Sequence, residues 1–121
     1  MVEQRRGGSM GASLKGLVVI INFPFSDLSD YKRRPALVIA DWQSNDVILC
    51  QITSIAHKDV FAIQLTDNDF LSGSLLKTSY IRPNKLFTAD KSTFLKQVGY
   101  ISSNKQKEVT DIIAKVLNAV F

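Results

Sequence analysis

The chain has 121 residues, of which 45% are hydrophobic and 21% are charged, and it carries a net charge of +4. This length supports one hydrophobic core, and the longest apolar runs, GLVVIINF and PALVIA, are too short to cross a bilayer. The sequence therefore predicts a single globular domain with no membrane partner, whose mild positive charge permits a polyanionic ligand without requiring one.

The first residues carry no clear structural signal. Arg5 and Arg6 are not followed by an apolar stretch, so this segment does not match a secretory signal. The sequence GGSMGAS is typical of a flexible leader or an expression remnant. We expect residues 1–13 to lie outside the fold and residues 14–121 to form the domain.

From Lys15 onward, short apolar segments alternate with polar breaks. Several of these segments are almost continuously apolar, as expected for strands whose two faces are both covered. The predicted strands span residues 17–23, 36–40, 47–52, 60–65 and 79–82, with a further candidate at 98–101. This pattern predicts a mainly β fold with some α structure, either a compact β-barrel or a strongly coiled sheet.

Cys50 is the single cysteine and lies within the apolar run DVILCQI. It cannot form an internal disulfide, and its position favours a small buried side chain in a reducing compartment. We therefore expect the protein in the cytoplasm.

The second half of the chain contains one turn-rich segment and one amphipathic helix. The sequence TDNDFLSGS predicts a turn or short helix, in which Gly73 adopts a conformation closed to other residues. Near the C-terminus, Ser103 and Gln106 match a capping box. The apolar face that follows at helical spacing consists of Val109, Ile112, Ile113, Val116, Leu117 and Val120. We expect this face to pack on the barrel.

The connection PFSDLSDYKRRP between the first two predicted strands is long, and it ends in two arginines. Pro35 fixes its own backbone and pushes Arg34 into an extended conformation, so Arg34 is the better anchored of the pair with Arg33. A guanidinium held in this way could bind a phosphodiester and stabilise its more highly charged transition state. An ion pair of Arg34 with Asp27 or Asp30 explains the local pattern equally well.

The motif QITS closes another apolar strand with two hydroxyl residues. Thr53 could donate a hydrogen bond to a phosphate oxygen or orient an attacking group, while Ser54 could cap the turn. Taken alone, the motif favours turn capping.

Aromatic side chains also lie near candidate phosphate ligands. In SYIRPN, Arg82 could contact phosphate while Tyr80 offers a face for base stacking, a combination found in grooves for single-stranded nucleic acid. Phe23 and Phe25 could stack as well, although the FPF sequence at a strand end is more typical of core packing.

Several other chemistries lack support. His57 is the only histidine, which excludes acid–base catalysis by two histidines, and the sequence AHKD around it is typical of a turn. The acidic residues are scattered through turns, and Asp27 and Asp30 are more typical of turn formers than of cation ligands. No phosphate-binding glycine motif or serine-hydrolase motif is present. We predict no metal and no cofactor.

Taken in order, these segments resemble a known family. KGLVVIINFPFSDLSDYKRRPALVIAD, DVILCQITS, SYIRPNKLFTADKSTF and VGYIS, with the final helix, are similar to the MazF/PemK toxins of bacterial type II toxin–antitoxin systems, and FPFSD is typical of the PemK-like branch. The resemblance covers residues 15–120. It implies a compact SH3-like or CcdB-like β-barrel with a C-terminal amphipathic helix, and a homodimer.

The resemblance also implies an activity. It predicts a sequence-specific, ribosome-independent endoribonuclease that cleaves single-stranded RNA, including mRNA, without a metal and is neutralised by a cognate antitoxin. The nucleophile would be the 2'-hydroxyl of the RNA itself, and the products would end in a 2',3'-cyclic phosphate and a 5'-hydroxyl.

Carried over residue by residue, the resemblance implies that Arg34 and Thr53 are catalytic. Because the guanidinium pKa is very high, we favour charge stabilisation over proton transfer for Arg34. The chain departs from the family pattern at Leu17 and at Ser79-Tyr80, so we transfer no target sequence. The expected RNA-binding residues are Phe25, Ser26, Asp27, Lys32, Arg33, Ser54, Tyr80 and Arg82.

Two alternatives of other classes remain open. CcdB-like relatives share this barrel and poison DNA gyrase through a terminal helix, and this chain also ends in a predicted helix followed by Phe121. The other alternative is a small RNA-binding module that does not cleave. Deleting the last three residues should abolish gyrase poisoning and largely spare RNA cleavage.

Overall fold

The computed structural model describes residues 12–24, 31–55 and 59–119. The elements in these ranges are β1 (Leu17–Pro24), β2 (Tyr31–Ala40), β3 (Asp46–Thr53), β4 (Ile63–Leu65), the 3-10 helix η2 (Asp67–Asp69), β5 (Phe70–Gly73), β6 (Ser79–Asp90), the 3-10 helix η3 (Lys91–Thr93), β7 (Lys96–Ile101) and α1 (Ser103–Leu117). Within these same ranges, no helix combines the length and the apolar character needed to span a membrane.

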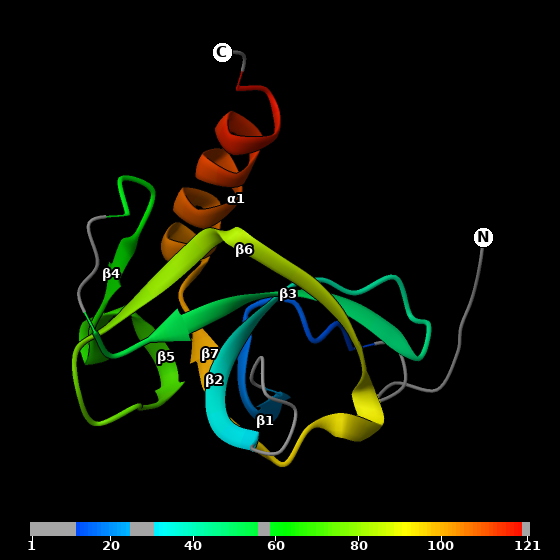
Figure 1. Cartoon of the computed structure of the whole chain (residues 1–121). Helices are drawn as coiled ribbons and strands as arrows, with labels where there is room; N and C mark the ends of the chain where they lie inside the picture. Colours follow the sequence, from blue (N-terminus) through cyan, green and yellow to red (C-terminus); the bar gives the residue numbers. More distant parts are fainter. Residues whose placement is uncertain (1–11, 25–30, 56–58, 120–121) are drawn as a thin grey trace.

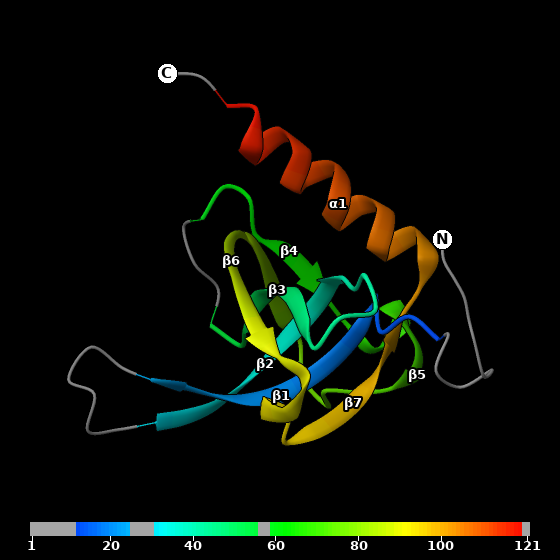
Figure 2. The same ribbon diagram turned by 90° about the vertical axis from the view of Figure 1, so that its right-hand side faces the viewer.

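The strands form one antiparallel sheet in the order β4-β6-β3-β2-β1-β7-β5. The sheet is strongly curled into a half-barrel, and α1 crosses one side of it and then rises away from the strands (Figures 1 and 2). The prediction of a mainly β, barrel-like fold with a C-terminal amphipathic helix is confirmed.

The curled sheet has an apolar core on each face. The helix-side core contains Val18, Leu37, Cys50, Ile52, Ile63, Leu65, Ile81, Ile101, Val109 and Ile113. The second core contains Leu17, Val19, Ile21, Ala36, Val38, Val47 and Leu49. Because neighbouring residues of a strand point to opposite faces, the central strands must be apolar on both sides, which explains their almost continuous apolar sequences. Burial of Cys50 is likewise confirmed.

The aromatic residue at the end of β1 belongs to the second core. The rings of Phe23 and Phe87 lie 4.9 Å apart at 73°, an edge-to-face contact between β1 and β6. Phe23 therefore has the packing role that the FPF sequence favoured.

Strand β2 begins earlier than predicted, at Tyr31 instead of residue 36. Much of the expected long connection is therefore strand, and Arg34 and Pro35 pair with Ile21 and Ile20 of β1. Pairing of β2 with β3 begins only at Ala36, one residue after Pro35, which has no N–H to donate to a ladder.

Strand β6 is longer than predicted and continues beyond Pro83 to Asp90. Its register with β3 shifts at this point, because Arg82 lies opposite Gln51 whereas Leu86 lies opposite Cys50. The three residues 83–85 form an irregularity, which is where a sheet tolerates proline. Figure 1 shows β6 bent sharply near its middle.

Two predicted segments are corrected by the structure. Of the predicted strand 60–65, only β4 (Ile63–Leu65) is a strand. Val60 lies before it and is 88% exposed, so it does not contribute to the core. Segment 66–74 forms η2 and then β5, a strand that the sequence analysis missed because its four residues are mostly exposed. Gly73 has a φ of +78°, and a Cβ there would lie 2.0 Å from the carbonyl oxygen of Val98, so the prediction for Gly73 is confirmed.

The start of α1 differs by one residue from the prediction. Ser102, not Ser103, is the N-cap, and its hydroxyl accepts a hydrogen bond from the N–H of Lys105 at 3.2 Å. Gln106 instead donates through Nε2 to the carbonyl oxygen of Ile101. Of the predicted apolar face, Val109 and Ile113 are buried, whereas Leu117 is 69% exposed because the helix end projects past the sheet.

Candidate functional site

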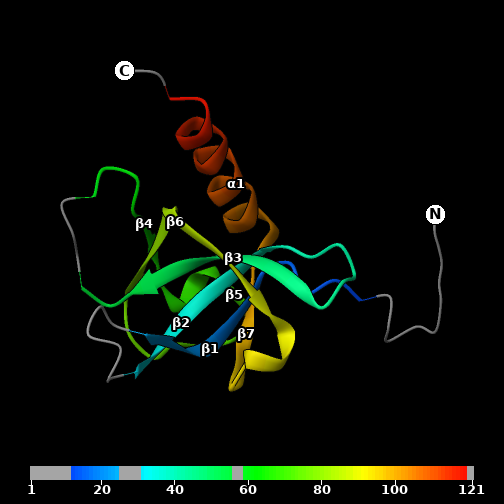
Figure 3. The ribbon, with the colours of Figure 1, turned by 45° about the vertical axis from the view of Figure 1, so that its right-hand side comes forward.

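A groove of about 380 Å³ lies where β2 and β3 separate. Residues from four parts of the chain line it: Ile20 of β1; Lys32, Arg33, Arg34 and Pro35 of β2; Ile52, Thr53, Ser54 and Ile55 at the end of β3; and Leu75, Lys77 and Ser79 before and at the start of β6. In the sheet, β3 lies between β2 and β6 (Figure 3), so a single groove can collect side chains from all three strands.

Strand register brings the two predicted catalytic residues together. Ala36 is the first residue of β2 that pairs with β3, and its partner is Gln51. Arg34, two residues before Ala36, and Thr53, two residues after Gln51, both line the groove that opens where this pairing stops. Arg34 is half-buried, and its backbone is held by pairing with β1.

Thr53 is 7% exposed, and its hydroxyl has a defined partner. The Oγ1 atom accepts a hydrogen bond from the N–H of Ile55 at 3.2 Å, so Thr53 caps the turn that Ser54 was expected to cap. A threonine hydroxyl that accepts one bond still has its own proton to donate. The turn thus fixes the Thr53 side chain while its donor stays usable.

The groove is rich in cations. Lys32 and Arg33 are exposed and line it as predicted, and Ser54 lines it too. Lys77 adds a cation that the sequence analysis missed, because a lysine in a polar connection carries no signal of its own. These charges favour an anionic ligand.

Tyr80 and Arg82 lie beside the groove and are not among the residues that line it. Tyr80 is half-buried on β6, directly opposite Thr53 on one side and Gln64 of β4 on the other. The Nε of Arg82 donates to Oδ2 of Asp59 at 3.2 Å, and the two side chains are only 19% and 7% exposed.

Asp59 remains charged in this partly buried site. Burial alone would raise its pKa, but hydrogen bonds from the N–H of Phe61, from Arg82 and from Asn84 together hold the pKa below its ordinary value. The carboxylate thereby ties the connection after β3 to β6, an arrangement that the sequence analysis missed.

Some predicted residues lie outside the described ranges. They are Phe25, Ser26 and Asp27 of the RNA-binding set, Asp30, His57, Val120 of the predicted helix face, and Phe121. The alternative ion pair of Arg34 with Asp27 or Asp30 therefore remains open.

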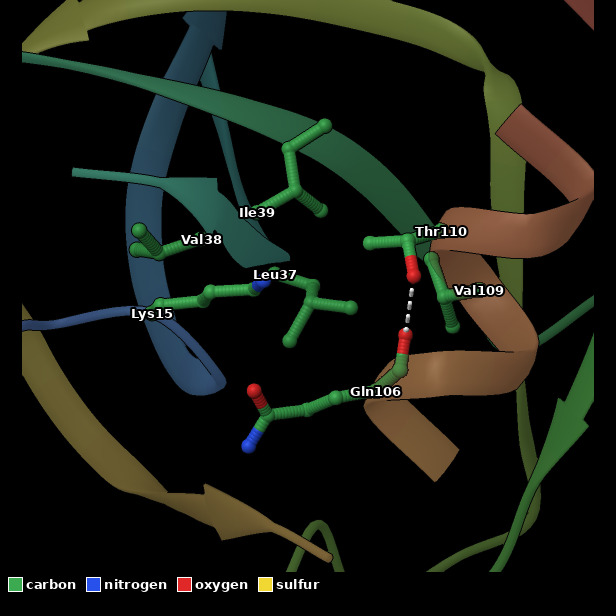
Figure 4. A pocket seen from close by; sticks show the side chains of 7 residues that line it. All are labelled: Lys15, Leu37, Val38, Ile39, Gln106, Val109 and Thr110. Carbon is green, nitrogen blue, oxygen red and sulfur yellow. Dashed lines mark hydrogen bonds between the residues drawn. The ribbon is translucent and has the colours of Figure 1, made fainter. Parts of the chain in front are cut away.

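Neither Cys50 nor the hollow beneath α1 offers a competing catalytic site. Burial raises the pKa of Cys50 to about 12, so its thiol is not a nucleophile at neutral pH. The hollow beneath α1, where Thr110 donates to the carbonyl oxygen of Gln106, measures about 10 Å³, which is barely room for one water (Figure 4). Within the described ranges, no three His, Cys, Asp or Glu side chains converge as metal ligands.

The chain was compared with models of protein families and with curated protein sequences. Residues 14–117 match the family described as PemK-like, MazF-like toxin of type II toxin–antitoxin system. No curated protein sequence matches the chain.

Solved structures share the fold. An endoribonuclease from a mycobacterial species, in complex with its cognate antitoxin, has 17% identity and a TM-score of 0.70 over 91% of this chain and 99% of its own. The MazE–MazF structure from Deinococcus radiodurans has 22% identity and a TM-score of 0.68 over 88% and 96%. The Mycobacterium tuberculosis toxin MazF-mt6 has 14% identity and a TM-score of 0.61 over 85% and 99%.

Proposed function

Since the chain belongs to the PemK-like, MazF-like toxins of type II toxin–antitoxin systems, we propose that it is an endoribonuclease that cleaves single-stranded RNA and inhibits growth. The observation that supports this proposal is the cationic groove that Arg34 and Thr53 both line. A cognate antitoxin, whose acidic segment would lie along the same groove and cover Arg34, would neutralise it.

In the proposed reaction, the 2'-oxygen of the RNA attacks the adjacent phosphorus while the bond from phosphorus to the 5'-oxygen breaks. The 2'-hydroxyl loses its proton and the departing 5'-oxygen gains one, so no water is consumed. The products are a 2',3'-cyclic phosphate and a 5'-hydroxyl. Negative charge accumulates on the phosphate oxygens at the transition state, and this charge is what the site must stabilise.

Arg34 is the residue suited to that task. Its guanidinium presents a rigid fork of N–H donors that matches two phosphate oxygens and stays charged at any working pH. The backbone of Arg34 pairs with β1 and is further restrained by the adjacent Pro35. Together these two restraints fix the direction in which its side chain leaves the strand. Fixed positive charge of this kind removes the need for a metal ion.

Thr53 would assist by donating its hydroxyl proton to a phosphate oxygen or by orienting the 2'-hydroxyl. The hydrogen bond from Ile55 holds Oγ1 in place, so little conformational freedom is lost when RNA binds. Lys32, Arg33 and Ser54 would contact neighbouring phosphates.

The adjoining strand would take the RNA beyond the groove. Tyr80 could stack on a base, and Arg82 has guanidinium donors besides the Nε that Asp59 accepts. The segment that carries Phe25, Ser26 and Asp27 follows β1 directly and would complete the RNA-binding surface. Family membership further supports a homodimer that acts in the cytoplasm.

The test is cleavage of a mixed-sequence single-stranded RNA by the purified protein in EDTA, with analysis of the product ends. We expect cyclic phosphate and 5'-hydroxyl ends, and loss of cleavage by Arg34→Ala with no change in its circular dichroism. Lys107→Ala is the matched control, because Lys107 is an exposed cation on α1 that pairs with Asp111. Undiminished cleavage by Arg34→Ala would overturn the role given to this residue.

A further inference from the structure

A second hollow adjoins the groove. It measures about 290 Å³ and is lined by Thr66, Asp67, Asn68, Leu76, Lys77 and Thr78. Its walls are η2 on one side and the connection between β5 and β6 on the other. Lys77 lines both the hollow and the groove, so a ligand leaving the groove passes this cation as it enters the hollow.

The two walls are held together by one hydroxyl. The Oγ of Ser74 donates to Oδ1 of Asp67, and this Oγ also accepts a hydrogen bond from the N–H of Leu76 at 2.8 Å. The start of this connection is fixed as well, because Gly73, the last residue of β5, packs directly against the backbone of Val98 of β7. The hollow is therefore a built feature whose shape exists before any ligand arrives.

The chemistry of the hollow suits a base better than a phosphate. Asp67 and Asn68 are exposed and offer a carboxylate and an amide, groups that form hydrogen bonds with the edges of bases. The negative charge of Asp67 disfavours an anion inside the hollow, whereas Lys77 at its edge favours one there. Leu76 is 87% exposed at the hollow and gives an apolar surface for a base or ribose.

We propose that this hollow is a subsite for a nucleotide that flanks the cleaved bond. This inference rests on the proposed ribonuclease function. Lys77 contacts the phosphate that joins the flanking nucleotide to the strand in the groove. Asp67 and Asn68 contact the base and contribute to the choice of target sequence.

The test uses RNAs that share one cleaved sequence and are trimmed one nucleotide at a time from either end. With Asn68→Ala, we expect KM for the longest RNA to rise about tenfold while kcat is unchanged, since the lost contact is remote from the reacting atoms. The ratio of variant to wild-type KM should fall to one when the flanking nucleotide is removed from one particular end. Lys77→Ala should raise KM for long and short RNAs alike, because Lys77 also lines the groove.

Base preference gives an independent readout. Asp67→Asn keeps an oxygen that can accept from Ser74 but removes the charge, so the walls of the hollow stay in place. In a pool of RNAs with randomised flanking positions, this variant should change the preferred base only at the position identified by trimming.

The proposal is overturned if the effect of Asn68→Ala is absent or is equal at all RNA lengths, or if Asp67→Asn leaves every base preference unchanged. Failure of the wild-type protein to cleave any of the RNAs would instead refute the ribonuclease function. Lys107→Ala controls for general loss of positive charge, and urea unfolding verifies that each variant is folded.

Discussion

The chain contains the dipeptide Arg-Pro twice, and the two copies flank the same strand. Arg34-Pro35 lies on β2 and Arg82-Pro83 lies on β6, and β3 runs between these strands. Both arginines are extended, as expected for a residue before proline. Both prolines also interrupt pairing with β3 next to Gln51, which is the partner of Ala36 and of Arg82.

The two arginines nevertheless have different surroundings. The ladder between β2 and β3 does not extend to residues before Ala36, and Arg34, on that unpaired side, lines the groove. At Pro83 the ladder shifts register and resumes, so β6 stays on the sheet, and Arg82 is drawn to the nearly buried Asp59. Arg34 therefore lines the groove, whereas Arg82 ties β6 to the connection after β3.

The largest expected difference concerns activity after a substitution that keeps the charge. Arg34→Lys should lower kcat by about a hundredfold, because an ammonium cannot replace the two-pronged contact with the transition-state phosphate. Arg82→Lys should change kcat by less than about threefold, since a lysine can still pair with Asp59. Single-turnover cleavage of one RNA under saturating protein measures both effects. Equal losses in the two variants would remove the functional distinction between the two dipeptides.

A smaller effect is expected on stability. Asp59→Ala should lower the free energy of unfolding by about 2 kcal/mol, because it removes a turn acceptor and leaves the guanidinium of Arg82 partly buried without its partner. In a double-mutant cycle with Arg82→Ala, the coupling energy should be about 1 kcal/mol. Urea unfolding measures each variant.

The exposed pair of Lys107 and Asp111 on α1 is the matched control for this cycle. Its coupling energy should stay below about 0.5 kcal/mol, because exposed ion pairs in helices contribute little. A coupling between Asp59 and Arg82 no larger than that of the helix pair would show that Asp59 does not hold Arg82 in place.

Local sequence predicted one half of this comparison and missed the other. The conformation of Arg34 follows from Pro35, and the buried strands follow from runs such as LVVII and DVILCQI, whose patterns are local. The partner of Arg82 is 23 residues away, beyond a connection whose course no local pattern specifies. The placement of Lys77 in the groove depends in the same way on how the connection before β6 folds back.

The missed elements have related causes. β5 has four mostly exposed residues and is a strand only because it pairs with β7. β6 continues past a proline that normally ends a strand signal, because the sheet absorbs it as an irregularity. At the start of α1, Ser102 and Ser103 are both suitable caps, and Ser102, whose N–H donates to the carbonyl oxygen of Asp69, is the one used. Tertiary contacts, not residue preferences, settled each of these cases.

Acid should weaken the ion pair between Arg82 and Asp59. The pKa of Asp59 is held below its ordinary value in the folded protein, so its contribution to stability is fully present above the unfolded pKa, which is about 3.9. That contribution is lost as the pH falls through the lower, folded pKa. We therefore expect the urea concentration at the unfolding midpoint, measured from pH 7 to pH 2.5, to decrease once the pH is below about 4.

The Asp59→Asn variant isolates this contribution from that of other carboxylates. Asp41 also has a lowered pKa, because hydrogen bonds from the N–H groups of Leu14 and Gln43 and the nearby Lys91 outweigh its burial, so some acid sensitivity must remain in the variant. Relative to wild type, the variant should have a lower midpoint at neutral pH and a smaller drop in acid, so that the two curves converge as the carboxylate is protonated. Parallel curves would mean that Asp59 titrates alike in the folded and unfolded chain, and that Arg82 gains nothing from its charge.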